Sequence, residues 1–320
     1  MLNARVYPNG EFSIWEEKKD LQVSGPPEQP DYLGLSLLPN SHRVALGMAE
    51  PPGERSQRGL SGITKLGART IRNGAFLLER KYRQGNLTFL TCTLPLVSET
   101  AEYNAGREWA EIVRIFNQSI VRLLAAAGLP ASYVACTEIQ EKRYRERGGL
   151  PLHLHMVFPG RKPFSGWAIS ADQFRGCWYN AVTARCPEFK GKNFGASVDC
   201  QAVKRSAENY LGKYMTKGAA SLSNILREDP GIAEFLPRSW WSCSRLVKDA
   251  IALEITGGLD TAMKLARDVR AGDSRIGFSA EVKITMADGN EIPVAIVGKL
   301  TAEGRARYCW RPGRIPQELN

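Results

Sequence analysis

Two histidines separated by one residue are the clearest chemical signal in the sequence. His153 and His155 flank Leu154 in the segment 152–158, whose composition predicts a β-strand. Side chains alternate between the faces of a strand, so both imidazoles would share one face while Leu154 points into the core. Two neutral imidazoles on one face can bind a divalent metal ion. The alternative is a chance pair of histidines on an exposed strand.

A metal site would need a third ligand. Glu138 lies on the preceding predicted strand, 133–140, and Gln140 shares its face. Pairing of the two strands could bring either side chain beside the histidines. The alternative for Glu138 is a solvated carboxylate near a strand end. The remaining histidine, His42, lies in a weakly patterned region and is expected to be exposed.

The second chemical signal is a tandem repeat of Tyr-x-x-Lys. It places Tyr210 and Tyr214 four residues apart, and likewise Lys213 and Lys217. On a helix, residues four apart share a face. A free phenol has a pKa of about 10 and is a poor nucleophile, but a nearby ammonium group or a metal-bound phosphate would stabilise the phenolate. The alternative is an amphipathic helix with packed tyrosines and solvated lysines.

The elements that must position these residues follow from periodicity and from turn signals. Charged, glycine-ended 141–149 predicts the tip of a hairpin. The order of elements indicates an antiparallel sheet with helices packed on it. Strands are predicted at 86–95, 133–140, 152–158 and 196–203, and helices at 63–82, 101–127, 171–186 and 206–217.

The flanking regions are predicted as extensions of a central domain over 61–245. Residues 1–60 have proline-rich stretches and at best a strand pair near 7–15, so they are predicted as an N-terminal extension and linker. Residues 246–320 are predicted as a C-terminal extension, with two helices ending near 269 and a hairpin around 287–290.

The composition favours a polyanionic partner. The chain has 43 Lys and Arg against 33 Asp and Glu, a net charge of +10. Positive charge favours binding to phosphates by releasing their counterions. The basic stretches 65–83 and 143–147 could contact a DNA backbone, and a solvated surface is the alternative for each.

Other classes are disfavoured by what the sequence lacks. Seven scattered cysteines without a Cys-x-x-Cys pair predict neither a zinc ribbon nor a disulfide framework. Without a long apolar run or a signal-peptide core, we expect a cytoplasmic protein that does not cross a membrane. No Gly-x-x-x-x-Gly-Lys-[Ser/Thr] loop occurs, so no ATPase or helicase domain is expected.

Three segments follow one another along the chain: Thr91-Cys92-Thr93-Leu94-Pro95, His153-Leu154-His155 and Tyr210-x-x-Lys213-Tyr214-x-x-Lys217. In this order they resemble the HUH endonuclease superfamily, named for a histidine–hydrophobic–histidine motif. The resemblance is to its two-tyrosine replication initiators, found in single-stranded DNA phages and some plasmids. It spans about residues 65–245, and 237–245 also looks like the segment that follows the tyrosine helix in phage-type members.

The resemblance implies a fold and a metal site. The fold would be α+β, a five-stranded antiparallel sheet with flanking helices, and the histidines would lie on a central strand. His153 and His155 would bind Mg²⁺ or Mn²⁺, with Glu138 as the best match for the third ligand. The hairpin between Glu138 and His153 is longer than expected for the family, so Gln140 and Glu141 stay open as alternatives.

The resemblance also implies an activity. Tyr210 and Tyr214 would be nucleophiles that nick and rejoin single-stranded or origin DNA through a 5′-phosphotyrosine, while Lys213 and Lys217 position the phosphate or the metal. A host helicase and a polymerase would be partners. The alternatives are an HUH transposase or relaxase, a non-catalytic DNA-binding relative, and an unrelated metallohydrolase. Relaxases usually place the tyrosine before the histidines, and insertion-sequence transposases usually begin with a cysteine-rich zinc module.

Overall fold

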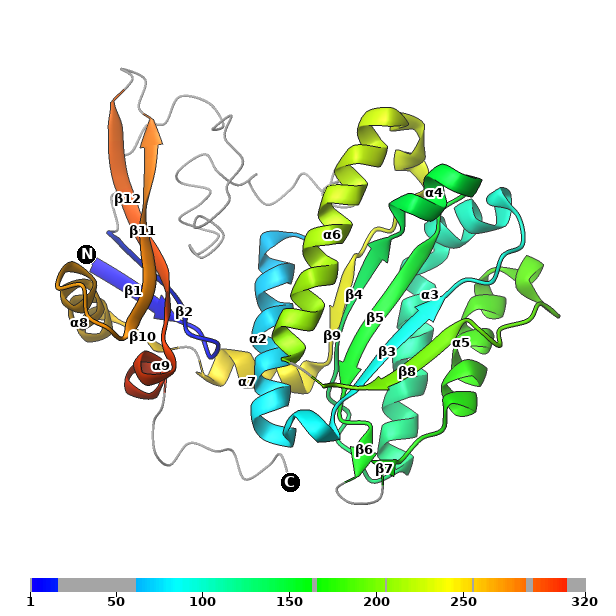
Figure 1. Ribbon diagram of the computed structural model, residues 1–320, viewed down its shortest axis with the longest axis horizontal. Coiled ribbons are helices and arrows are strands. Elements are labelled where there is room, and N and C mark those ends of the chain that lie inside the picture. The colour runs from blue at the N-terminus through cyan, green and yellow to red at the C-terminus, as the bar shows by residue number, and fades with distance from the viewer. Residues whose placement is uncertain are drawn as a thin grey trace. The chain divides into compact units, whose positions relative to one another are not determined.

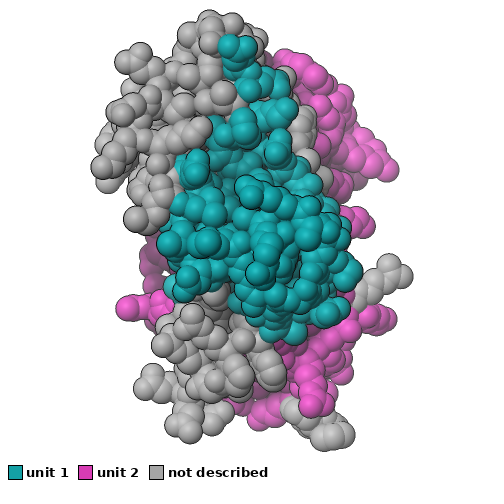
Figure 2. All heavy atoms as spheres, turned by 90° about the vertical axis from the view of Figure 1, so that its left-hand side faces the viewer, with its two compact units in different colours: residues 1–55, 251–320 teal, residues 56–250 magenta. Residues whose placement is uncertain are grey.

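The chain divides into two compact units, unit 1 (residues 1–55 and 251–320) and unit 2 (residues 56–250), which are coloured separately in Figure 2. His42, the proline-rich stretches and most of the turn predicted at 287–290 lie outside the described residues. Within those residues, no helix has both the length and the apolarity to cross a bilayer. The computed structural model describes residues 2–16, 62–162, 166–204, 206–254, 256–285 and 290–309.

Unit 2 is built on a five-stranded sheet in which all neighbouring strands are antiparallel. The strand order is β8-β3-β5-β4-β9, so β5 is central. The α+β class and the five-stranded antiparallel sheet with flanking helices are confirmed. The strands are β3 (Thr88–Thr93), β4 (Val134–Ile139), β5 (Leu152–Phe158), β8 (Val198–Ala202) and β9 (Trp241–Cys243), beside a separate ribbon of β6 (Arg161–Lys162) and β7 (Gly166–Trp167).

Helices cover both faces of this sheet (Figure 1). On one face lie α3 (Glu99–Ala126) and α5 (Ala171–Arg185), and on the other lie α2 (Lys65–Tyr82) and α6 (Ala207–Glu228). Each helix begins after a hydroxyl residue whose side chain accepts a hydrogen bond from the backbone N–H three residues on, which stabilises its first turn. These residues are Thr64, Ser98, Ser170 and Ser206.

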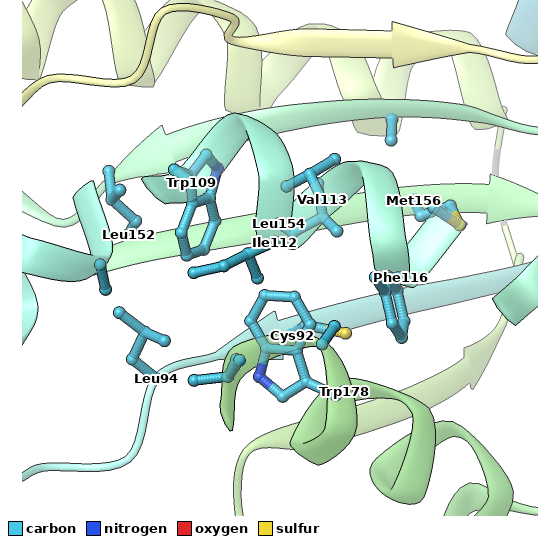
Figure 3. Close-up of a cluster of buried hydrophobic side chains, with 14 of the residues drawn as sticks. Cys92, Leu94, Trp109, Ile112, Val113, Phe116, Leu152, Leu154, Met156 and Trp178 are labelled. Atoms are coloured by element: carbon cyan, nitrogen blue, oxygen red, sulfur yellow. The ribbon is translucent and has the colours of Figure 1, made fainter. Parts of the chain in front are cut away.

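The main hydrophobic core lies between the sheet and the α3–α5 layer. Leu154 and Met156 of β5 pack there with Trp109 and Phe116 of α3 and with Trp178 of α5 (Figure 3). The two tryptophan rings meet edge to face at 5.7 Å between centroids. Because residues alternate along a strand, burying Leu154 on this face turns its two neighbours to the α2–α6 face.

Two predicted elements differ from the structure. The helix predicted at 206–217 extends to Glu228, because Leu222 and Ile225 continue its buried face beyond the tyrosines. The segment 141–149, predicted as a hairpin tip, contains the helix α4 (Glu141–Arg147). Short isolated helices are only marginally stable in water, so side-chain contacts with α3 and α6 must hold α4 in place.

Unit 1 combines residues from both ends of the chain in a second antiparallel sheet of order β10-β1-β2-β12-β11. Its first two strands form a hairpin, and β2 also pairs with β12. The strand pair predicted near 7–15 is right for β2 only, because β1 comes before that range and residues 7–10 form the turn. The elements are β1 (Leu2–Val6), β2 (Glu11–Glu16), β10 (Thr256–Gly257), α8 (Leu259–Arg270), β11 (Ile276–Thr285), β12 (Glu291–Leu300) and α9 (Ala302–Cys309), after α7 (Arg245–Glu254), which spans the boundary between the units.

Candidate metal centre beside a tyrosine helix

The central strand of unit 2 carries both histidines. His153 and His155 face the α2–α6 side of β5, while Leu154 between them is 1% exposed in the core, as the alternation predicted. In the strand register, His153 is opposite Glu138 of β4, and His155 is opposite Thr91 of β3. The two neighbouring strands therefore bring polar side chains to both sides of the histidine pair.

Glu138, His153 and His155 form a group that could hold a metal ion. Their ligand atoms all lie within 4.8 Å of one another. Glu138 Oε2 is 2.9 Å from His155 Nε2, and these two residues are 1% and 2% exposed. In the described part of the chain, this is the one group of three or more His, Cys, Asp or Glu side chains with such spacing.

The chemistry of the three side chains fits a cation. Burial, together with the neighbouring His155, lowers the pKa of His153 from 6.5 to about 3, and burial also lowers the pKa of His155. Both imidazoles are therefore neutral at pH 7 and carry a lone pair. His153 Nε2 is buried and has no hydrogen-bond partner among the described residues, so no neighbouring side chain competes with a cation for this nitrogen.

The carboxyl group of Glu138 supplies negative charge to the group. Burial raises its pKa, but hydrogen bonds from His155 and Lys217 outweigh burial and hold the pKa below its usual value. Lys217 Nζ lies 2.7 Å from Glu138 Oε1. Glu138 is thus ionised at neutral pH, as a metal ligand must be.

Two neighbours fix the orientation of the imidazoles. Thr91 Oγ1 lies 3.2 Å from His155 Nδ1, and Gln140 Nε2 lies 3.1 Å from His153 Nδ1. A hydroxyl can donate or accept, and an amide that turns over presents its oxygen instead. In the structure His155 Nε2 donates to Glu138. Both partners can also accept a proton on Nδ1, and in that tautomer each Nε2 carries the lone pair that a cation needs. Such neighbours orient ligands in known metal sites.

The contacts distinguish the three candidates for the third ligand. Glu138 lies directly within the group, whereas Gln140 contacts the far nitrogen of His153. Glu141 turns away, and its carboxylate accepts hydrogen bonds from Arg145 and Asn224. Of the three candidates, Glu138 therefore lies where a third ligand would lie, and Gln140 lies where it can orient His153.

Helix α6 brings the tyrosines to the same face. The ring of Tyr214 stacks on His155, with 3.8 Å between centroids and 27° between planes. Tyr210 lies one turn earlier and contacts the edge of Phe89, whose ring also stacks at 5.7 Å on Tyr214. Leu211 on the same helix is fully buried, so packing fixes the helix against the sheet.

The environment keeps the phenol of Tyr214 protonated. Burial, a hydrogen bond with Tyr210 and its charge, and the charge of Glu138 together raise the pKa of Tyr214 from 10 to about 12. Among the cations nearby, Lys213 Nζ lies 5.9 Å from the Tyr214 ring, while Lys217 is paired with Glu138. An additional positive charge would be needed to stabilise the phenolate at neutral pH.

Sequence reasoning missed the roles of Thr91 and Phe89. Both belong to a segment that reads as an ordinary buried strand, and only Leu90 and Cys92 of that strand enter the main core. Alternation along the strand predicts that Phe89 and Thr91 face away from that core, but not that His155 lies opposite Thr91. The segment 237–245 contains β9, an edge strand paired with β4.

No protein-family model matches this chain, and neither the curated proteins nor the solved structures that were searched contain a match.

Proposed function

We propose that this protein is a DNA-nicking and rejoining enzyme of the HUH type that initiates rolling-circle replication. The observation that carries the proposal is the stacking of Tyr214 on His155 at 3.8 Å, because it puts a phenol beside a group able to bind a cation. The placement of the histidines on the central strand and of both tyrosines on the helix above it agrees with what the resemblance implies.

Glu138, His153 and His155 would hold Mg²⁺ or Mn²⁺ through a carboxylate oxygen and the two Nε2 atoms. When bound, the ion supplies Lewis-acid polarisation of the phosphate to be cut. Thr91 and Gln140 would keep the imidazoles oriented by accepting the protons on their Nδ1 atoms, Gln140 with its amide turned so that the oxygen faces His153.

The tyrosines carry out a phosphoryl transfer. The phenol oxygen forms a bond to phosphorus in single-stranded DNA, and the bond from phosphorus to the 3′ oxygen breaks. The phenol releases its proton and the leaving 3′ oxygen takes one up, so the products are a 3′-hydroxyl and a 5′-phosphotyrosine. The phosphodiester energy is kept in the new bond, and attack by a 3′-hydroxyl on the phosphotyrosine rejoins the strand without ATP.

The first attack is assigned to Tyr214. Its ring contacts His155, whereas the ring contacts of Tyr210 are to Phe89 and Tyr214. Two tyrosines one helical turn apart can alternate. After a round of synthesis the second tyrosine cuts the regenerated junction. The new 3′-hydroxyl then attacks the phosphotyrosine of the first tyrosine and releases that tyrosine from the DNA. Lys213 beside the Tyr214 ring contributes positive charge.

The proposed partners follow from this chemistry. The substrate is single-stranded or extruded origin DNA, in keeping with the net charge of +10. A polymerase extends the 3′-hydroxyl, and a host helicase separates the strands. The proposed setting is the cytoplasm of the cell in which that DNA replicates.

A nicking assay tests the proposal. The full chain is incubated with a labelled pool of randomised single-stranded oligonucleotides, with Mn²⁺ or with EDTA. We expect shortened products and a covalent protein–DNA band with Mn²⁺ only. Both should disappear in the double variant Tyr210→Phe/Tyr214→Phe. Cleavage that continues at the wild-type rate in the double variant would refute the role of the tyrosines.

A further inference from the structure

A groove of about 890 Å³ lies between α4 and α6, and we call it the α4 groove. Its lining includes Gln140, Lys142, Arg147 and Lys217 together with the exposed side chain of Leu96. Its volume is within the range of about 300–1,000 Å³ that is typical of ligand sites. The groove is formed entirely by unit 2.

The α4 groove is strongly cationic. Five lysine and arginine residues line it, against two glutamates. Charges gathered in a concave surface with protein walls attract an anionic ligand more strongly than the same charges on a flat surface. The cations are Lys142, Arg143, Arg145, Arg147 and Lys217, and the glutamates are Glu141 and Glu146.

Three contacts hold α4 in place. Arg143 forms an ion pair of 2.5 Å with Glu102 of α3, and both side chains are largely buried. Tyr144 donates a hydrogen bond of 2.8 Å to Asp229, just beyond α6. Arg145 pairs at 2.7 Å with Glu228, the last residue of α6. These residues serve to anchor a helix that is too short to be stable alone.

Two cations of the same helix are left for a ligand. The Lys142 side chain is 88% exposed and lies 3.8 Å from Glu146, at the outer limit of an ion pair. Arg147 is exposed and forms no ion pair within the part of the chain that the structure describes. A rigid helix therefore presents two available positive charges to the groove.

The α4 groove leads directly to the candidate metal centre. Gln140, which lines the groove, is hydrogen-bonded to His153, and Lys217, which also lines it, is paired with Glu138. A chain of phosphates with one phosphate at the metal centre would therefore continue into the groove. Exposed Leu96 provides an apolar surface for a sugar or a base.

We propose that the α4 groove binds the backbone of single-stranded DNA beside the phosphate that is cut, through Lys142 and Arg147. This inference rests on the proposed function, which it deepens by assigning the path of the strand. The bound segment is single-stranded, as in the proposed substrate. Arg143 and Arg145 hold the helix and do not take part in contacts with the phosphates.

The test compares two double variants of the full chain that lose the same charge. Lys142→Ala/Arg147→Ala removes the available cations of the α4 groove. Lys190→Ala/Lys192→Ala removes two exposed lysines that follow α5 on the other side of the sheet. Binding of fluorescent oligothymidine is measured by anisotropy in EDTA over a range of salt concentrations, and thermal unfolding verifies that both variants fold.

The groove variant should bind about ten-fold more weakly at physiological salt. The slope of log binding constant against log salt concentration should also be smaller by about 1.4, since each of the two lost phosphate contacts contributes about 0.7 for single strands. The control should stay within about two-fold. Equal losses in both variants, or none in the groove variant, would overturn the inference.

The outcome is separable from that of the nicking assay, since EDTA prevents metal-dependent cleavage. If the groove variant binds more weakly and the wild type forms no DNA adduct in Mn²⁺, the α4 groove binds single-stranded DNA but the proposed tyrosine chemistry is wrong. Normal binding in the groove variant, combined with adducts in the wild type, would reject the groove alone.

Discussion

At the scale of single residues, the candidate site depends on side chains that orient the histidines. His155 is held between Thr91 on one nitrogen and Glu138 on the other, and His153 has Gln140 on one nitrogen only. Orientation by neighbours reduces the entropy that a ligand loses when a metal binds. The affinity for a cation should therefore depend on residues that do not touch it.

Replacing Thr91 by Val tests this dependence. Valine keeps the shape of threonine but cannot accept a proton from His155 Nδ1, so the affinity for Mn²⁺ should fall by about 10–100-fold. Thr93→Val is the matched control, because Thr93 lies on the same face of β3 and its hydroxyl has no hydrogen bond with the described residues. Calorimetric titration with Mn²⁺ measures both, and equal affinities would contradict the role of Thr91.

At the scale of elements, local patterns predicted most of what carries the site. The alternation of apolar and polar residues over 152–155 predicted the faces of β5, and the step of four residues predicted the shared face of Tyr210 and Tyr214. Helix α4 could not be predicted, because its stability comes from partners distant in sequence such as Glu102 and Asp229. For the same reason, the contact of Thr91 with His155 was not predictable from spacing.

The close packing of α3 leads to a second prediction. A Cβ added to Gly106 would overlap the backbone carbonyl oxygen of Phe235 and the side chain of Leu150. Gly106→Ala should therefore destabilise unit 2 by about 1–3 kcal/mol, although alanine normally favours a helix. Gly176→Ala, in the exposed part of α5 with no atom within 4 Å of the added Cβ, should instead stabilise by up to about 1 kcal/mol.

Urea unfolding of both variants provides the measurement. Equal stability of Gly106→Ala and Gly176→Ala would contradict the close contact between α3 and the backbone at Phe235.

At the scale of the whole molecule, the chain forms two units with separate cores. The core of unit 2 is the cluster around Trp109 and Trp178, and that of unit 1 includes Phe12 and Leu265. The sequence predicted the flanking regions as separate extensions, whereas β2 pairs with β12 from the other end of the chain. Pairing between strands so far apart in sequence cannot be predicted from local patterns, since the pattern of each strand is compatible with many partner strands.

A metal ion that binds Glu138, His153 and His155 should stabilise unit 2. Mn²⁺ at about 100 times its dissociation constant would raise the free energy of unfolding by about 2.7 kcal/mol. Tryptophan fluorescence follows the unfolding in the variant Trp15→Phe, which keeps buried Trp109 and Trp178 of unit 2 and removes a buried tryptophan of unit 1. The rise should be absent in His153→Ala, and a rise of the same size in that variant would show that the ion binds elsewhere.

Unit 1 should respond to acid through Asp273. The backbone N–H and the guanidinium group of Arg275 both donate hydrogen bonds to the Asp273 carboxylate and lower its pKa from 3.8 to about 2. A lowered carboxyl pKa adds stability above pH 3.8, and this stability is lost as the pH falls through about 2. At neutral pH the wild type should therefore have a higher melting temperature than Asp273→Asn, and this difference should vanish near pH 2. A difference that is independent of pH would contradict the ion pair.

The measurement that tests the central claim most directly is mass spectrometry of the protein after incubation with single-stranded DNA and Mn²⁺. Trypsin cleaves after Lys213, so Tyr210 falls in the peptide 206–213 and Tyr214 in the peptide 214–217. The account predicts a nucleotide attached through its 5′-phosphate, first on the peptide with Tyr214 and later also on that with Tyr210. DNA cleavage that leaves both peptides unmodified would contradict it.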